Sequence, residues 1–178
     1  MIAPDLAGFG KSDKPGDASW HTLSNHIQII KSLIIKLDLK DITLFGQDWG
    51  SMIGLRLAYE LSERFSGIII SNGGLPTGLE KPPFRFTIWK SIARYSPILP
   101  IGQIVNFACN KKLSKAEKMG YRAPFEGSKF KIGVRTLPRQ VPFNRKNPDS
   151  AINRQAWLFL SSWRKPFLTV FGNDDPIT

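Results

Sequence analysis

Cysteine and long apolar runs are nearly absent from this chain. The single thiol, Cys109, excludes an internal disulfide framework, and we expect it to be partly buried. No stretch approaches the roughly 20 apolar residues that a membrane-spanning helix needs. The first residues, 1–5, have neither the basic start nor the apolar run of a secretory signal. We therefore expect a globular, cytoplasmic protein with no membrane partner.

Acidic residues are also scarce, with 14 Asp and Glu against 25 Lys and Arg and a net charge of +11 at pH 7. An excess of this kind raises the possibility of nucleic-acid binding. The basic residues are scattered, however, and they accompany no zinc-ligand spacing, RNP-like segment or basic zipper. We therefore expect no nucleic-acid partner.

Apolar periodicity predicts alternating helices and strands in the first half of the chain. Residues 23–37 carry an apolar stripe at helical spacing, and residues 52–61 repeat that pattern. The runs 42–45 and 67–72 read as buried strands, the second because it is continuously apolar. This alternation predicts a parallel sheet with helices on both faces, an α/β fold.

The pattern changes after Gly73, where prolines become frequent and no clear strand appears until about residue 165. Residues 167–171 then read as a strand again, followed by Gly172-Asn173-Asp174-Asp175. We predict a core at 1–78, a mostly helical insertion at 79–165, and a further core strand with its loop at 166–178.

The segment Gly46-Gln47-Asp48-Trp49-Gly50 joins the first predicted strand to a helix. A strand, a tight glycine turn and a helix form the setting of a nucleophile elbow, which exposes the side chain at its centre above the sheet. Glycines on both flanks would permit strained angles and a close approach of strand and helix. The central side chain here is a carboxylate, which attacks carbon to form an alkyl ester. The simpler alternative is an Asp that only caps the following helix.

The Asp-centred elbow, the helical insertion and the Gly-x-x-Asp that follows the last strand together resemble the α/β-hydrolase fold. Within that fold they resemble the haloalkane dehalogenases and the related epoxide hydrolases. The opening segment, residues 4–12, is similar to a loop of the same superfamily. One branch of these enzymes places the catalytic acid after the strand that ends here at Asn72, which is no carboxylate. The resemblance therefore implies that Asp175 is the acid, with Asp174 as the second choice.

The resemblance also implies a halide site made of indole N–H donors. Trp49 follows the nucleophile, and Trp89 lies in a segment, residues 87–90, that is similar to the cap segment carrying the family's second halide-binding tryptophan. Phe125 and Val134 are expected to line the apolar substrate pocket, although a core role is equally open for each. Epoxide hydrolases use two cap tyrosines instead, and residues 95 and 121 leave that alternative open.

The implied reaction has two steps and needs no metal or cofactor. Asp48 displaces halide from an alkyl carbon, and a histidine oriented by Asp175 then activates water against the ester, with the backbone N–H of Trp49 in the oxyanion hole. The only histidines, His21 and His26, precede Asp48, whereas the triad order of this fold places the histidine after the acid.

We expect both of these histidines to lie on the solvated surface. We therefore expect the chain to be the middle of a longer enzyme that is monomeric when intact. Its histidine would lie beyond residue 178, and a His-Gly motif would lie before residue 1. A non-catalytic protein of the same fold is the remaining alternative.

Overall fold

In the computed structural model, the chain folds into two units, which are described separately. The structure describes residues 1–173 and 175, so the second candidate acid, Asp174, lies outside the described residues. The helical unit comprises Met1–Thr22 and Phe84–Gln140, and the sheet unit comprises Leu23–Pro83 and Val141–Thr178.

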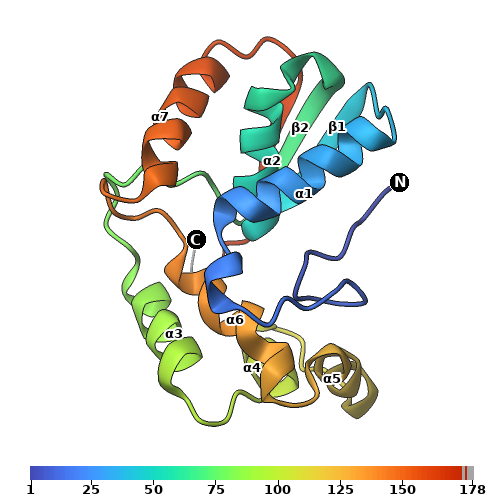
Figure 1. Cartoon of the computed structure of the whole chain (residues 1–178), viewed down its shortest axis with the longest axis vertical. Helices are drawn as coiled ribbons and strands as arrows, with labels where there is room; N and C mark the ends of the chain where they lie inside the picture. The colour runs from blue at the N-terminus through green and yellow to red at the C-terminus, as the bar shows by residue number, and fades with distance from the viewer. Residues whose placement is uncertain (174, 176–178) are drawn as a thin grey trace. The chain divides into compact units, whose positions relative to one another are not determined.

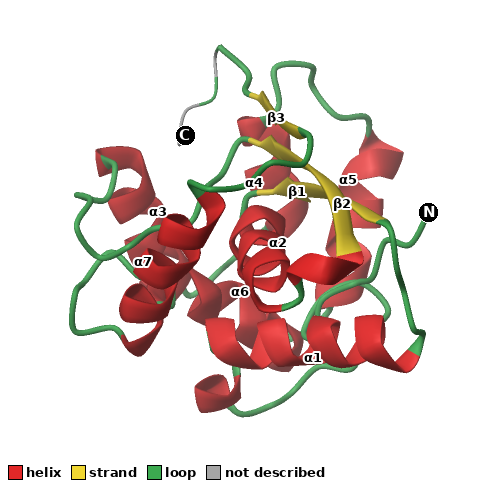
Figure 2. Ribbon diagram, turned by 90° about the horizontal axis from the view of Figure 1, so that it is seen from above, coloured by secondary structure: helices red, strands yellow, loops and turns green. Residues whose placement is uncertain are grey.

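The sheet unit contains three parallel strands in the order β1-β2-β3 (Figure 2). The strands are β1 (Ile42–Gln47), β2 (Phe65–Ser71) and β3 (Phe167–Val170), and the helices are α1 (Leu23–Lys36), α2 (Trp49–Glu60) and α7 (Pro148–Leu160), with a short η2 (Ser62–Arg64). The predicted alternation of helices and strands is thus confirmed. The register pairs Gln47 with Ser71 and Ser71 with Val170, so the three strands end level with one another.

Helix α2 packs closely on β1 because Gly54 has no side chain. A Cβ at this position would lie 2.6 Å from the side chain of Leu44. The opposite face of β1, which carries Thr43, Phe45 and Gln47, is exposed. The sequence pattern predicts helices on both faces, whereas α1 and α7 of this unit pack mainly against α2.

A buried polar network joins α2 to α7. Arg56 donates hydrogen bonds to Asn153 Oδ1 (2.9 Å), Asp149 Oδ1 (3.3 Å) and Glu60 Oε1 (3.2 Å). Three side chains of α7 also donate to successive carbonyls of the segment that leaves β2: Trp157 to Leu75 O, Asn153 to Pro76 O and Arg154 to Thr77 O. Helix α7 therefore fixes this segment where the chain leaves the sheet unit.

The helical unit contains four helices longer than one turn, and no strand among its described residues (Figure 1). They are α3 (Phe84–Tyr95), α4 (Ile101–Ala108), α5 (Lys115–Arg122) and α6 (Ile132–Thr136), with 3₁₀ turns η1 (Ala18–Trp20), η3 (Ala123–Phe125), η4 (Ser128–Lys131) and η5 (Leu137–Arg139). The prolines explain this broken pattern, because Pro97 and Pro100 separate α3 from α4 and others begin η3 and η5. The mostly helical character predicted for this segment is confirmed.

His21 is buried in the helical unit, where the sequence predicts a solvated loop residue. Its ring nitrogen Nε2 lies 3.1 Å from Pro15 O, and its Cε1 atom would lie 2.8 Å from a Cβ at Gly8 and 3.2 Å from one at Gly133. Gly8 also has a φ of +90°, which favours glycine. The glycines of the first loop and of α6 therefore make room for the imidazole.

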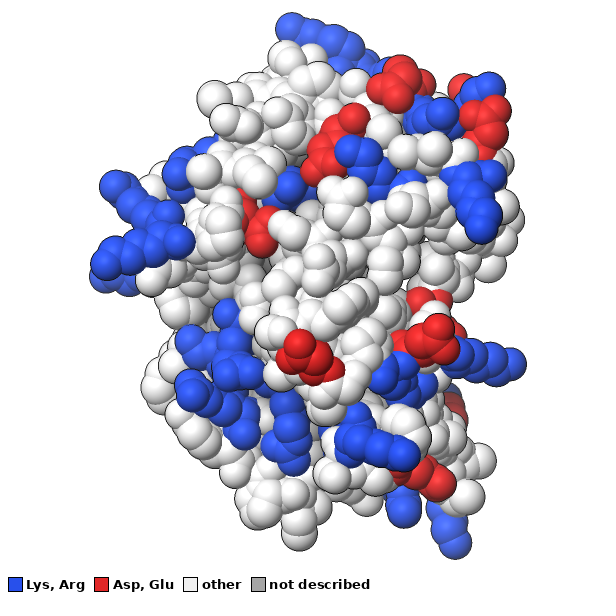
Figure 3. Space-filling view, in the orientation of Figure 1, with Lys and Arg blue, Asp and Glu red and all other residues white. Residues whose placement is uncertain are grey.

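The expected division of the chain at residues 78/79 and 165/166 stays a prediction. The two compact units group the residues in another way and place α7 with the sheet. In the described part of the chain, no helix is long and apolar enough to cross a membrane. Cys109 is a half-buried free thiol, as predicted. Lys and Arg are spread over the visible face rather than gathered in one block (Figure 3).

Candidate active site

The turn between β1 and α2 holds Asp48 in a strained backbone conformation. Its φ is +48° and its ψ is −115°, and left-handed φ values are uncommon for residues other than glycine. Such strain persists only where the surroundings impose it, and it clusters at functional sites. Asp48 makes no side-chain capping hydrogen bond to α2, so the simpler reading of this residue as a helix cap is not supported.

The two glycines that flank the elbow do different things. A Cβ on Gly46 would lie 2.8 Å from Gly50 O and 3.0 Å from the Cα of Ser51, so only glycine allows the strand and helix to approach this closely. A Cβ on Gly50 would meet nothing within 4 Å. Neither glycine has a left-handed φ, so the predicted backbone strain falls on Asp48 itself.

The turn is fixed by contacts with the chain that follows β2. The backbone N–H of Asp48 donates to Asn72 O at 3.1 Å, and the Ser51 hydroxyl donates to Asp48 O at 2.5 Å. A Cβ on Gly73 would lie 2.3 Å from the Ser51 hydroxyl and 2.8 Å from the Asp48 nitrogen. The ends of β1 and β2 are therefore packed so closely that the Asp48 backbone has little freedom.

Asn72 joins the end of β2 to the loop after β3. Its amide nitrogen donates to Asp175 Oδ2 at 2.6 Å, and its amide oxygen accepts from the Gly172 backbone N–H at 3.3 Å and from the Ser71 hydroxyl at 3.1 Å. Asn72 also has a left-handed φ of +39°. Sequence reasoning excluded Asn72 as an acid and missed this bridging role, for which its place at a strand end was the only signal.

The structure brings the two predicted carboxylates, Asp48 and Asp175, within electrostatic reach of each other. Asp48 is exposed as a residue, yet protein atoms crowd its carboxyl group, and this loss of hydration is the main cause that raises its pKa above the usual 3.8. The backbone N–H of Trp49 opposes the rise by stabilising the carboxylate, and the negative charge of Asp175 adds to it.

Trp49 begins α2, and its ring packs against the buried ring of His26. The two ring centres are 6.2 Å apart with a 61° angle between the planes. The burial of His26 at 1% exposure contradicts the sequence prediction of a solvated histidine. The pattern offered a signal for this, since His26 lies on the same helical stripe as the buried residues Leu23 and Ile27.

The other three predicted residues lie together in the helical unit. Trp89 on α3 and Val134 on α6 are half-buried, and both pack against a cluster formed by Leu99, Ile101 and Phe125. Asp48, Trp49 and Asp175 belong to the sheet unit. The structure thus groups the predicted residues into two sets, one around the carboxylates and one around Phe125.

The indole N–H groups of Trp49 and Trp89 differ from that of Trp157 in their hydrogen bonding. Among the described residues, neither donates a hydrogen bond, whereas Trp157 donates its N–H to Leu75 O at 2.7 Å. The ring nitrogen of Trp163 is buried. Within the same residues, no three His, Cys, Asp or Glu side chains are grouped as metal ligands would be.

The parallel sheet, the strained Asp elbow and the aspartate in the loop after β3 agree with the comparison of the sequence with protein families. Residues 1–178 match the family model described as the alpha/beta hydrolase fold. The chain therefore belongs to the α/β-hydrolase fold family, as its fold predicts.

Within that family, the relatives confirm the resemblance to haloalkane dehalogenases. The chain is 44% identical over 177 residues to haloalkane dehalogenase 1 of Mycobacterium tuberculosis, covering 99% of the chain and 59% of that protein. It is 42% identical over 178 residues to a haloalkane dehalogenase of Psychrobacter cryohalolentis, covering 100% of the chain and 59% of that protein. The chain thus spans about three fifths of the length of these curated relatives.

A solved structure supports the same likeness. The tetrameric haloalkane dehalogenase DpaA of Paraglaciecola agarilytica superposes with a TM-score of 0.85 at 29% sequence identity. The match covers 93% of this chain and 56% of that one.

Proposed function

We propose that this chain carries the alkylation site of a haloalkane dehalogenase, which hydrolyses haloalkanes to an alcohol and a halide ion. The observation that carries the proposal is Asp48 in a strained elbow, followed directly by a tryptophan whose indole N–H has no acceptor among the described residues. The similarity to dehalogenases along the whole chain supports it.

In the first step, a lone pair of the Asp48 carboxylate forms a bond to the alkyl carbon, and the carbon–halogen bond breaks with its electron pair leaving on the halide. The indole N–H groups of Trp49 and Trp89 stabilise the departing ion. An ionised carboxylate can make this attack, and a protonated one is a very poor nucleophile.

In the second step, water hydrolyses the alkyl ester while the backbone N–H of Trp49 stabilises the oxyanion. A histidine oriented by Asp175 activates the water. Because the triad order places that histidine after the acid, neither His21 nor His26 is proposed for this role. The apolar lining proposed for Phe125 and Val134 suits a haloalkane, which has no hydrogen-bonding groups to satisfy.

The alternative of an epoxide hydrolase is less well supported. Tyr95 and Tyr121 are 70% and 49% exposed, and no described contact joins them. The monomeric state expected from the sequence stays a prediction, and the Paraglaciecola relative is described as tetrameric.

The first step can be tested without turnover. The purified chain is incubated with 1,2-dibromoethane, and bromide release is followed together with the mass of the peptide that contains Asp48. We expect at most one bromide per chain and a bromoethyl adduct on Asp48. Asp48→Asn should give neither. A parallel incubation with styrene oxide tests the epoxide hydrolase. Opening of styrene oxide by a chain that releases no bromide from 1,2-dibromoethane would support the epoxide hydrolase, and no adduct with either reagent would contradict both enzymes.

The halide site can be tested by fluorescence quenching with bromide. Trp89→Phe keeps the ring packing and removes the N–H, and the loss of one hydrogen bond to a charged group costs roughly 1.5–3 kcal/mol. We therefore expect bromide binding to weaken by about ten-fold or more, and likewise for Trp49→Phe. Trp157→Phe is the control, because its N–H is used by Leu75 O. Equal effects of all three changes would contradict the assignment.

A further inference from the structure

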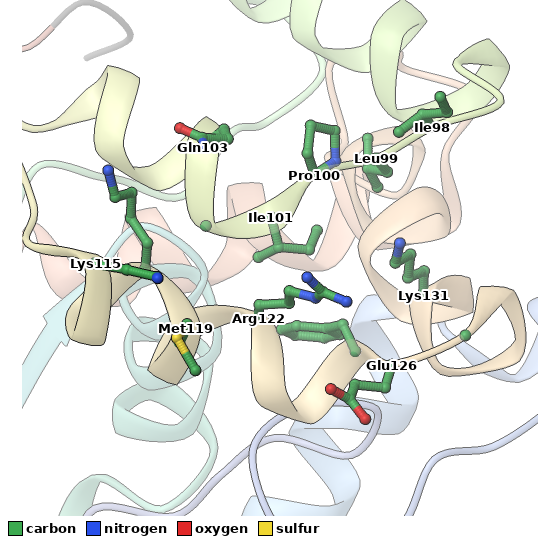
Figure 4. Close-up of a pocket in the computed structure, with 14 residues that line it drawn as sticks. Ile98, Leu99, Pro100, Ile101, Gln103, Lys115, Met119, Arg122, Glu126 and Lys131 are labelled. Atoms are coloured by element: carbon green, nitrogen blue, oxygen red, sulfur yellow. The ribbon is translucent and has the colours of Figure 1, made fainter.

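A hollow of about 680 Å³ opens in the helical unit where α4 packs against α5 (Figure 4). The two helices approach closely because a Cβ on Gly102 would lie only 2.4 Å from Lys118 O. The loop between them is tied by the Leu113 backbone N–H, which donates to Asn106 Oδ1 at 2.8 Å. Ser114 and Glu117 then form a capping box that begins α5. The hollow is therefore framed by contacts that restrict both helices.

The floor of the hollow is apolar and its rim is cationic. Leu99, Ile101 and Phe125 on the floor are buried and belong to one hydrophobic cluster. The cationic residues on the rim are Lys115, Lys118 and Arg122 from α5 and Lys131 from η4. The spacing of the first three brings them to one face of α5. Figure 4 shows Arg122 between Ile101 and Glu126, with Lys115 and Lys131 on either side.

These cations are not neutralised within the protein. Among the described residues, none of the four forms an ion pair or a side-chain hydrogen bond, and Glu126 is the one carboxylate among the residues that line the hollow. Four positive charges around a concave, partly apolar surface raise the local concentration of anions. A bound anion would relieve their mutual repulsion.

We propose that this hollow binds a small anionic amphiphile, in which a carboxylate head meets Arg122 and the neighbouring lysines and a short alkyl chain covers Ile101 and the exposed side chain of Met119. The volume lies within the roughly 300–1,000 Å³ of small-molecule sites. A haloalkane is neutral and gains nothing from the cations, so the ligand class differs from the proposed substrate. Phe125 is the one residue shared with the proposed substrate lining, and the inference does not rest on the proposed function.

The test is calorimetric titration of the full chain with hexanoate, hexan-1-ol and hexylamine at low ionic strength. We expect hexanoate to bind with one site per chain, and the alcohol and amine to bind about ten-fold more weakly or not at all, because they lack the charge-assisted hydrogen bonds. Arg122→Gln should weaken hexanoate binding by about ten-fold for the same reason. Lys129→Gln is the matched control, since Lys129 is exposed in η4 and does not line the hollow.

Three calorimetric outcomes would overturn the proposal: equal binding of hexanoate and hexan-1-ol, equal weakening by Arg122→Gln and Lys129→Gln, or no binding of hexanoate. Amide chemical shifts in the unaltered chain provide a measurement that does not depend on any variant. We expect hexanoate to perturb Ile101 and Phe125, and perturbation confined to other residues would equally overturn it. Because hexanoate has no halogen, the result is independent of whether the chain releases halide.

Discussion

At the scale of one residue, the ionised Asp48 carboxylate lowers the stability of the folded protein. Its folded-state pKa is raised, first by desolvation, so folding favours the protonated form. Protonated Asp48 contributes its full share to stability at a pH below the aspartate pKa of the unfolded chain. This contribution is lost as the pH rises through the higher pKa of the folded protein. At neutral pH the ionised carboxylate therefore opposes folding.

We predict that Asp48→Asn raises the melting temperature at neutral pH by on the order of a few degrees. The gain should disappear at a pH below the usual aspartate pKa of 3.8, where both side chains are neutral. Asparagine tolerates the left-handed φ, so the backbone should not confound the comparison. Thermal unfolding across pH checks this, with Asp13→Asn on the surface as the control. A variant that is less stable than the unaltered chain at neutral pH would contradict the prediction.

Asn72 allows a second test at the residue scale. Asn72→Leu has a similar size but removes the hydrogen bonds to Asp175 and Gly172. We expect the loop after β3 to loosen, with amide exchange at Gly172 faster by about five-fold, since one hydrogen bond contributes about 1 kcal/mol. Ser71→Ala is the control, because it leaves both of those bonds in place. If exchange is unchanged in Asn72→Leu, then Asn72 does not hold the loop.

At the scale of elements, a buried ion pair and its hydrogen bonds hold α2 and α7 of the sheet unit together. Arg56→Met would leave the buried Asp149 carboxylate without its cation, and breaking a buried pair in this way costs about 3–5 kcal/mol. We expect a loss of this size in urea unfolding. Arg154→Met, which removes only a half-buried hydrogen bond to Thr77 O, should cost about 1 kcal/mol. Asp149→Asn added to Arg56→Met should recover part of the loss, and no recovery would contradict the charge argument.

At the scale of the whole chain, the described sheet has two open edges and much exposed apolar surface. Phe45 on β1 and Leu168 on β3 are 66% and 54% exposed, and edge strands of this kind promote association. We predict that the purified 178-residue chain self-associates, as seen by light scattering, and that Phe45→Lys with Leu168→Lys reduces this. Phe107→Lys in the helical unit is the control, because Phe107 is also exposed but belongs to helix α4 and not to a strand. A monodisperse monomer of the unaltered chain would contradict the prediction.

Local sequence was enough to predict the strands, the main helices of the sheet unit and the elbow. Each depends on neighbours within a few residues, as with the apolar runs of β1 and β2 and the glycine at position 46, whose absent side chain lets α2 begin so close to the strand. Asp48 was identified from its local segment, whereas Trp49, Trp89 and Asp175 were selected by the resemblance to haloalkane dehalogenases. Their roles in catalysis stay a prediction.

Only the tertiary structure decided which side chains meet. Asn72 and Asp175 are 103 residues apart, and they come together because parallel β2 and β3 end level with one another. His21 and His26 were expected in solvent because one lies in a loop and the other near the start of a helix, yet glycines at 8 and 133 leave space for one ring and Trp49 covers the other. Burial of a polar side chain depends on partners from distant segments, and no local pattern specifies those partners.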